Sequence, residues 1–191
     1  NSVYGPVLNA IDNSKVPGGS SGGSAVAVQA QLCMASLGSD TGGSVRQPAD
    51  FCGIVGCKPG YGTISRYGLI AYASSFDQIG IFTRSVKDTA LLLEVMAQPD
   101  AYDSTMNPGS SVANISEYSL PSNKKYTLAY FKQVMHHPSL DKEIAAAIFE
   151  QVKKLRENGH TVDEIEFDLL EYIVPAYYVL TTAEASSNLS R

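Results

Sequence analysis

The sequence lacks the features that would place it in a membrane, a secreted or a nucleic-acid-binding class. It has no uninterrupted apolar run of about 20 residues, which a bilayer-spanning helix needs, and no basic-then-apolar signal segment. Acidic residues outnumber basic ones by 19 to 14, so the net charge of −5 provides no cationic footprint for a phosphate backbone. We therefore expect a soluble, cytoplasmic protein that makes no membrane contact.

Cysteine is also scarce. The three cysteines, Cys33, Cys52 and Cys57, are odd in number and lie among apolar or small neighbours. A disulfide scaffold is not expected at this length and density, and Cys52 and Cys57 have no histidine or second cysteine pair at zinc-site spacing. We expect buried, unreactive thiols and no metal site.

What is present is an ordinary globular composition. The 191 residues are 44% hydrophobic and 17% charged, which suits one domain with a sizeable core. The chain begins at Asn1 rather than Met and ends at Arg191 within a helical pattern. We interpret residues 1–191 as a single partial domain, the central portion of a longer polypeptide.

Two glycine-serine clusters stand out from this background. They occupy residues 17–24 (PGGSSGGS) and 40–44 (DTGGS), and the apolar segment Ala25–Leu37 separates them. That segment predicts a buried helix followed by a short strand, so both clusters can return to one place. The N–H groups of Thr41–Ser44 can form an inward-facing nest beside a serine, as in a nucleophile with its oxyanion hole. A tight glycine-rich loop is the alternative.

Familiar templates fail on the first cluster. A P-loop requires lysine and then serine or threonine after its second glycine, whereas residues 24–25 are serine and alanine. The nucleophile elbow G-x-S-x-G matches residues 18–22 but needs a buried strand before it, and residues 9–17 are polar and end in proline. A serine-histidine-acid triad would need a histidine. The histidines lie far along the chain, at His136, His137 and His160.

The remaining template is a serine activated by lysine, with a second serine that relays the proton. Residues 18–24 (GGSSGGS) and 38–48 (GSDTGGSVRQP) resemble the signature of the amidase signature family, and Ser20 and Ser44 have that family's spacing of 24 positions. The resemblance implies an α/β amidase signature fold, present here in part, with a mixed central sheet flanked by helices.

The flanking segments resemble one branch of that family. Residues 1–6 (NSVYGP), 65–84 (SRYGLIAYASSFDQIGIFTR) and 184–191 (EASSNLSR) are similar to the glutaminase subunits of glutamyl-tRNA(Gln) amidotransferases. The resemblance implies glutamine hydrolysis that supplies ammonia for converting Glu-tRNA(Gln) to Gln-tRNA(Gln), in a heterotrimer with the B and C subunits of such enzymes. It implies no cofactor in this chain, ATP and Mg²⁺ in a partner subunit, and tRNA held mainly by the partner.

The resemblance also assigns catalytic roles. Ser44 would be the nucleophile that forms the acyl ester, and Ser20, after a cis peptide bond, would be the bridging serine that relays the proton. The N–H groups of Thr41, Gly42 and Gly43 would form the oxyanion hole.

Further residues would support the site or bind the substrate. Asp40 and Arg46 would hold the loop by hydrogen bonds, with a surface ion pair as the alternative. Tyr178 or Tyr177 would contribute to the glutamine pocket, with core packing as the alternative. The groups that grip the amino and carboxylate groups of the substrate would lie beyond Arg191.

The resemblance places the family's lysine upstream of residue 1. Lys15 and Lys58 do not occupy the family position, and we interpret both as solvated or structural. We therefore expect residues 1–191 alone to have no glutaminase activity.

Hydrophobic periodicity predicts alternating strands and helices. The predicted strands are Ile54–Lys58, Ile79–Phe82, Tyr126–Phe131 and Thr161–Phe167. The predicted helices are Val45–Cys52, with its N-terminus toward the nucleophile; one from the Ser85/Asp88 capping box through Met96; one on Leu140, Ile144, Ile148, Val152 and Leu155, ended by Gly159; and Leu169–Leu189, interrupted by Pro175. The polar segment Pro99–Asn123 predicts a long surface connection.

Two other functions stay open from the sequence. One is a stand-alone amidase that uses the same serines on another carboxamide. The other is a catalytically inactive interaction or anion-binding domain in which both clusters are only loops.

Overall fold

The structure, a computed structural model, describes residues 2–106, 112, 115, 117 and 123–190. The chain forms two compact units, one made of Asn1–Leu120 with Leu180–Arg191 and one made of Pro121–Val179. That residues 1–191 form one partial domain stays a prediction. In the described part of the chain, no helix has both the length and the apolar character that a bilayer crossing requires.

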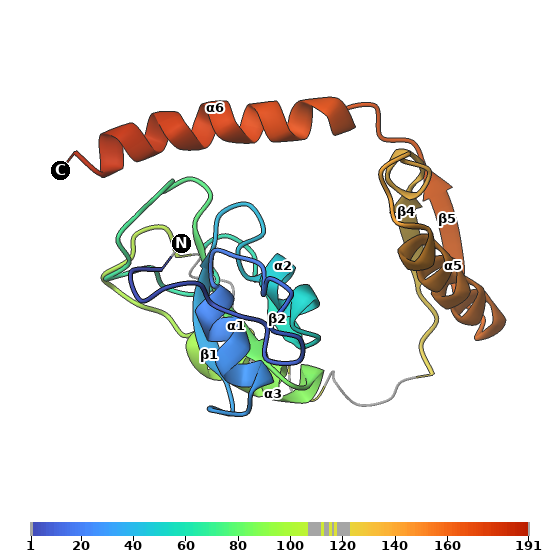
Figure 1. Ribbon diagram of the computed structural model, residues 1–191, viewed down its shortest axis with the longest axis horizontal. Helices are drawn as coiled ribbons and strands as arrows, with labels where there is room; N and C mark the ends of the chain where they lie inside the picture. Colours follow the sequence, from blue (N-terminus) through green and yellow to red (C-terminus); the bar gives the residue numbers. More distant parts are fainter. Residues whose placement is uncertain (1, 107–111, 113–114, 116, 118–122, 191) are drawn as a thin grey trace. The chain divides into compact units, whose positions relative to one another are not determined.

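The first unit is built on a three-stranded antiparallel sheet (Figure 1). Its strands are β1 (Ser36–Asp40), β2 (Val55–Cys57) and β3 (Gln78–Thr83), and β3 lies between the other two. The predicted strands Ile54–Lys58 and Ile79–Phe82 are thereby confirmed, with ends that differ by one residue.

Successive side chains of β3 enter two different cores because a strand points them to opposite faces. Phe82 packs with α1 (Gly22–Gln29) and α2 (Arg46–Phe51), whereas Ile81 packs with α3 (Val86–Met96). Both side chains are fully buried. The central strand is therefore covered on both faces, which fixes the position of β1 and of the loop that follows it.

The helix predicted within Ala25–Leu37 exists, but α1 is displaced toward the N-terminus and ends at Gln29. Gln31 has a φ of 60°, its N–H donates to Val28 O, and the N–H of Leu32 donates to Ala27 O. These bonds form a Schellman motif with a left-handed glutamine in place of the usual glycine. The helix end was therefore not visible in the sequence.

The predicted N-cap at the start of α3 is confirmed, but the Asp88 carboxylate accepts the Ser85 hydroxyl in place of the Ser85 N–H that a full capping box uses. The Ser85 hydroxyl accepts the N–H of Asp88 at 3.1 Å and donates to the Asp88 carboxylate at 2.7 Å. The helix then runs to Met96, as predicted. Most of the predicted connection Pro99–Asn123 lies outside the described residues.

The second unit contains a parallel pair of strands, β4 (Thr127–Phe131) and β5 (Thr161–Ile165), in agreement with the predicted strands. Between them run a short helix, α4 (Lys132–Met135), and α5 (Lys142–Glu157). Strands in both orientations therefore occur, in separate sheets among the described residues.

The predicted end of α5 is also confirmed. Gly159 has a φ of +83° directly after the C-cap residue Asn158. The predicted start of this helix is corrected: Asp141 caps the helix, so Leu140, the first residue of the predicted apolar set, lies before it.

The last helix, α6, runs without a break from Leu170 to Asn188. The predicted interruption at Pro175 is wrong. Proline removes one N–H from the helical ladder, and here that is the bond to the carbonyl of Glu171, one turn after the helix begins. The N–H groups that follow Pro175 can still bond within the helix, which continues.

Candidate active site

The structure brings the two glycine-serine clusters together. The N–H of Ser21 donates to the carbonyl of Ser44 at 3.2 Å, and the N–H of Gly19 donates to Gln47 Oε1 at 3.1 Å. Ser20 is exposed, Ser44 is half-buried, and the peptide bond between Gly19 and Ser20 is cis. The two clusters that contain the predicted catalytic serines therefore lie beside one another in the first unit.

The helix and strand between the clusters explain this convergence. Ser36 Oγ donates to Ser24 O at 2.8 Å, and Ser21 Oγ donates to Ser39 O at 3.3 Å. Ser24 is thus bonded to Ser36, and the earlier residue Ser21 is bonded to the later residue Ser39. The strand therefore runs back along the helix, so α1 leads away from the site and β1 returns to it. The chain thus returns to its starting point after one helix and one strand.

The loop after β1 is organised by the buried carboxylate of Asp40. Asp40 Oδ1 accepts the N–H of Gly43 at 2.7 Å, and Oδ2 accepts the N–H groups of Val45 at 3.1 Å and Arg46 at 3.3 Å. The Arg46 guanidinium adds Nη2 to Oδ1 at 2.9 Å and Nε to Oδ2 at 3.1 Å. This pair is therefore a hydrogen-bonded element of the loop, not a surface contact between two exposed side chains, since Asp40 is fully buried.

These contacts also decide the charge of Asp40. Burial by itself would raise the pKa of the carboxyl group. The hydrogen bonds from Arg46 and from the three backbone N–H groups outweigh burial, and the net effect lowers the pKa of Asp40. Asp40 is accordingly a carboxylate at neutral pH.

Asp40 changes the predicted oxyanion nest. Gly43 has a φ of +124°, which favours glycine, but its N–H points to Asp40 and not to a substrate. Among the hydrogen bonds of the described residues, the N–H groups of Thr41, Gly42 and Ser44 have no protein acceptor. The unoccupied donors of the loop are therefore those of Thr41, Gly42 and Ser44.

Asp40 also alters the predicted role of α2. The helix begins at Arg46, one residue after the predicted start at Val45, and the N–H groups of Val45 and Arg46 at its N-terminus donate to the Asp40 carboxylate. The positive end of the short helix is consequently occupied by a carboxylate from its own chain.

A second buried carboxylate, Asp77, reaches the other end of the same loop. Thr41 Oγ1 donates to Asp77 Oδ1 at 2.6 Å, while Oδ2 accepts the N–H groups of Tyr72 at 2.8 Å and Ala73 at 3.0 Å. Asp77 is 2% exposed. It is the one acidic residue in the segment 65–84, directly before β3, and this isolated position was the available sequence signal.

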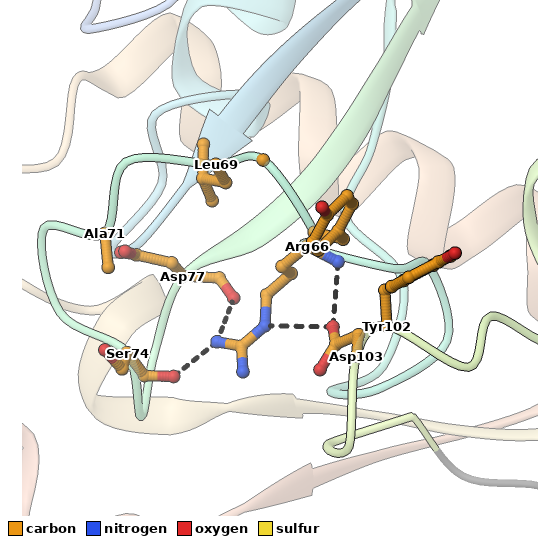
Figure 2. A pocket seen from close by; sticks show the side chains of 9 residues that line it. Arg66, Leu69, Ala71, Ser74, Asp77, Tyr102 and Asp103 are labelled. Atoms are coloured by element: carbon orange, nitrogen blue, oxygen red, sulfur yellow. Dashed lines mark hydrogen bonds and ion pairs between the residues drawn. The ribbon is translucent and has the colours of Figure 1, made fainter.

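Asp77 also lines a cavity of about 280 Å³, shown in Figure 2. Arg66 crosses this cavity, and its Nη1 donates to the carbonyls of Ser74 and Asp77. Asp103 lies opposite, where it accepts the N–H of Arg66 at 2.8 Å. Arg66 thereby links Asp103 to the loop that carries Asp77, while its buried Nε, 3.8 Å from Asp103 Oδ2, has no hydrogen-bond partner among the described residues.

The other predicted residues have separate surroundings. Tyr177 and Tyr178 lie on α6 in the second unit, with ring centroids 5.4 Å apart. Lys58 Nζ donates to the adjacent Pro59 carbonyl at 2.8 Å. In the second unit, the three histidines contact local groups. These contacts are His136 with Glu164, His137 with the Ser139 N–H, and His160 with the Tyr126 N–H.

The cysteines match the prediction in part. All three are free thiols; Cys52 is buried, whereas Cys33 and Cys57 are only half-buried. Burial raises the pKa of Cys52, and it also raises the pKa of Cys57 against the opposing effect of Lys58. A raised pKa leaves less thiolate at neutral pH, so these two thiols are less reactive.

The fold and the paired serine clusters define a class of protein. The family model for amidases matches residues 1–191, and the chain belongs to the amidase family. Solved structures of that fold align with nearly the whole chain, so the α/β amidase signature fold is established.

Particular relatives extend this result. The chain is 52% identical over 191 residues to the A subunit of the glutamyl-tRNA(Gln) amidotransferase of Campylobacter fetus subsp. fetus, covering 100% of this chain and 41% of the relative. The crystal structure of the corresponding A subunit of Thermotoga maritima is 43% identical with a TM-score of 0.86, over 98% of this chain and 41% of that one. The peptide amidase of Stenotrophomonas maltophilia is 28% identical with a TM-score of 0.81, over 95% and 37%. The chain thus spans about two fifths of the length of these relatives.

Proposed function

We propose that the protein is the glutamine-hydrolysing subunit of a tRNA-dependent amidotransferase and acts in the cytoplasm. The observation that carries the proposal is the hydrogen bond from the Ser21 N–H to the Ser44 carbonyl, which brings together the two serine clusters of the motif. The similarity to the A subunits of glutamyl-tRNA(Gln) amidotransferases supports glutamine as the substrate.

In this proposal Ser44 is the nucleophile. Its Oγ attacks the side-chain carbonyl carbon of glutamine, a C–O bond forms, and the C–N bond breaks. The hydroxyl proton passes through Ser20 to a neutral lysine and from there to the leaving nitrogen, which departs as ammonia. Water then attacks the acyl ester, which releases glutamate and regenerates the Ser44 hydroxyl.

The oxyanion of each tetrahedral intermediate would be stabilised by the unoccupied loop donors. These are the N–H groups of Thr41 and Gly42, which the sequence predicted, together with that of Ser44. Loss of one such donor typically costs about 3 to 4 kcal/mol of transition-state stabilisation. Gly43, the third predicted donor, instead bonds to Asp40 and so contributes the turn of the loop.

The remaining parts of the machinery come from outside residues 1–191 in this proposal. The lysine would be supplied by an upstream segment, and the groups that bind the substrate's amino and carboxylate groups by a downstream one. The B and C subunits would complete a heterotrimer, in which a partner holds ATP and Mg²⁺ and also holds most of the tRNA. Tyr178 or Tyr177 would contribute to the glutamine pocket.

The decisive experiment measures ammonia release from glutamine by the full-length protein assembled with its partner subunits. Ser44→Ala should lower kcat by about 10⁴-fold or more because the nucleophile is lost, and Ser20→Ala by about 10² to 10⁴-fold because proton transfer is lost. Ser24→Ala is the matched control from the same cluster and should stay within about twofold of the wild type. Ammonia release unchanged by Ser44→Ala would refute the proposal.

A stand-alone amidase is the second candidate, because the peptide amidase of Stenotrophomonas maltophilia shares the fold at 28% identity. Purification of the natural protein separates the two functions. The amidotransferase proposal requires co-purification with a tRNA-binding partner and glutamine as the preferred substrate. A solitary protein that prefers another carboxamide would favour the second candidate.

A further inference from the structure

Two buried carboxylates hold opposite ends of the loop that carries the candidate nucleophile. Asp40 binds the end nearer to Ser44, through the N–H groups of Gly43, Val45 and Arg46. Asp77 binds the beginning of the loop, through the hydroxyl of Thr41 at 2.6 Å. The unoccupied N–H groups of Thr41 and Gly42 lie between these two attachments.

The Asp77 carboxylate is itself held firmly. Its second oxygen accepts two backbone N–H groups, and its backbone carbonyl accepts a hydrogen bond from Arg66 Nη1 at 3.2 Å (Figure 2). The loop that supplies those N–H groups is bonded to the end of α6 within the same unit. Glu184 accepts the Ser75 N–H at 3.0 Å, and Asn188 Nδ2 donates to Tyr72 O at 3.2 Å.

A fixed carboxylate at this place restricts Thr41. Threonine is β-branched and has few side-chain rotamers, so a hydroxyl held at 2.6 Å fixes the direction of the Cα–Cβ bond and, with it, the residue's backbone. The N–H of Thr41 is then pre-oriented before any substrate binds. Oxyanion donors act in this way because they need no reorganisation during the reaction.

We propose that Asp77 is a positioning residue for the oxyanion site, acting through the Thr41 hydroxyl. The inference rests on the proposed function, since it assigns Asp77 to the same acyl-transfer site. Asp77 touches neither the substrate nor Ser44 in this role. It sets the direction of one stabilising donor.

The test uses the full-length protein assembled with its partner subunits and compares kcat with KM for glutamine. Asp77→Ala and Thr41→Val each remove the hydrogen bond and should lower kcat by about 10 to 100-fold, less than deletion of a whole donor, with KM within about twofold. Thr41→Ser keeps the hydroxyl. Asp77→Asn can donate to Thr41 Oγ1 while its oxygen accepts the backbone N–H groups. Both should therefore retain kcat within about fivefold.

Two comparisons distinguish a positioning role of Asp77 from a general effect on the stability of the protein. In the double variant Asp77→Ala/Thr41→Val, kcat should be no lower than in the less active of the two single variants, because both changes remove the same hydrogen bond. Asp141→Ala is a control for stability, since Asp141 caps α5 in the second unit by accepting the N–H groups of Glu143 at 2.8 Å and Ile144 at 3.3 Å. It should lower the melting temperature yet leave kcat within about threefold.

The outcomes distinguish this inference from the proposed function. If Ser44→Ala stays active, the proposed function fails and the inference fails with it. If Ser44→Ala is inactive while Thr41→Val keeps wild-type kcat, only the inference is overturned. Multiplicative losses in the double variant, or an equal loss of kcat in Asp141→Ala, would also overturn it. Should Asp77→Ala not fold, the loss in Thr41→Val and its restoration by Thr41→Ser decide the question.

Discussion

At the scale of single residues, the Asp40 side chain accepts five hydrogen bonds in the candidate site. Its side chain is fully buried, whereas the Arg46 side chain that pairs with it is 53% exposed. Removing the carboxylate would therefore leave Arg46 solvated but would deprive three loop N–H groups of their acceptor. The backbone contacts, more than the ion pair, should account for the contribution of Asp40 to stability.

We expect Asp40→Asn to lower the free energy of unfolding by about 3 kcal/mol, because hydrogen bonds to a charged acceptor are lost. Chemical denaturation of the full-length protein measures this loss. Asp12→Asn is the control, since the exposed Asp12 side chain accepts the N–H and the hydroxyl of nearby Ser14. It should change stability by less than about 0.5 kcal/mol. Equal effects of the two variants would contradict the expectation.

Asp40 should also make the stability of the protein depend on pH. Because the pKa of Asp40 is lowered in the folded state, the unfolded state binds more protons between the two pKa values. The contribution of Asp40 is therefore complete above its unfolded pKa of about 4 and is lost as the pH falls through the folded pKa. The stability difference between wild type and Asp40→Asn should therefore be constant well above about pH 4 and shrink as the pH falls below about 4. A difference that stayed constant over the whole range would show that the charge of Asp40 does not matter.

At the scale of the elements, close approach between α1 and the sheet positions the first serine cluster. A Cβ on Gly38 of β1 would lie 2.6 Å from Ser21 Oγ and 2.8 Å from Phe82 Cε2. Both contacts are shorter than van der Waals distance, so no larger residue fits while α1 keeps its place. The register of β1 with β3 thus sets where Ser21, and Ser20 beside it, can lie.

We expect Gly38→Ala to destabilise the full-length protein by about 1 to 3 kcal/mol, because overpacking must displace Ser21 or Phe82. Ammonia release should fall as well, since Ser21 is bonded to Ser44 through its N–H. Gly23→Ala is the matched control: a Cβ there meets nothing within 4 Å, and alanine favours the helix by about 0.5 to 1 kcal/mol. Thermal melting and kcat of both variants test this, and an inert Gly38→Ala would contradict it.

The elements also show how far local sequence patterns reach. The end of α5 was predictable, because Gly159 is the usual residue for a left-handed C′ position. The end of α1 has the same backbone hydrogen bonds around Gln31, a residue that gives no such signal. At Pro175 the local preference was misleading, since one missing N–H near the start of α6 does not stop the helix.

At the scale of the whole molecule, the site is built from segments of one unit, whereas Tyr177 and Tyr178 belong to the other. The relatives are longer than this chain, which covers about two fifths of their length. In the proposed mechanism, the lysine and part of the glutamine pocket come from outside residues 1–191.

We therefore expect a polypeptide limited to residues 1–191 to release no ammonia from glutamine above the background of Ser44→Ala. Without the lysine, the Ser44 hydroxyl keeps its proton and is a weak nucleophile. Circular dichroism of the same sample establishes whether it is folded. Glutaminase rates comparable with those of the full-length protein would show that residues 1–191 contain every catalytic group.

The sequence by itself determined the family signature, the spacing of Ser20 and Ser44, most strands and helices, and the capping of α3. These features depend on residues close together in the chain, where glycine, proline, periodicity and capping have direct conformational effects. Only the tertiary structure decided that Gly43 donates its N–H to Asp40 and that Asp77 reaches Thr41 across 36 positions. The physical reason is that a buried carboxylate bonds whichever donors the folded chain brings within reach, and sequence spacing does not specify those donors.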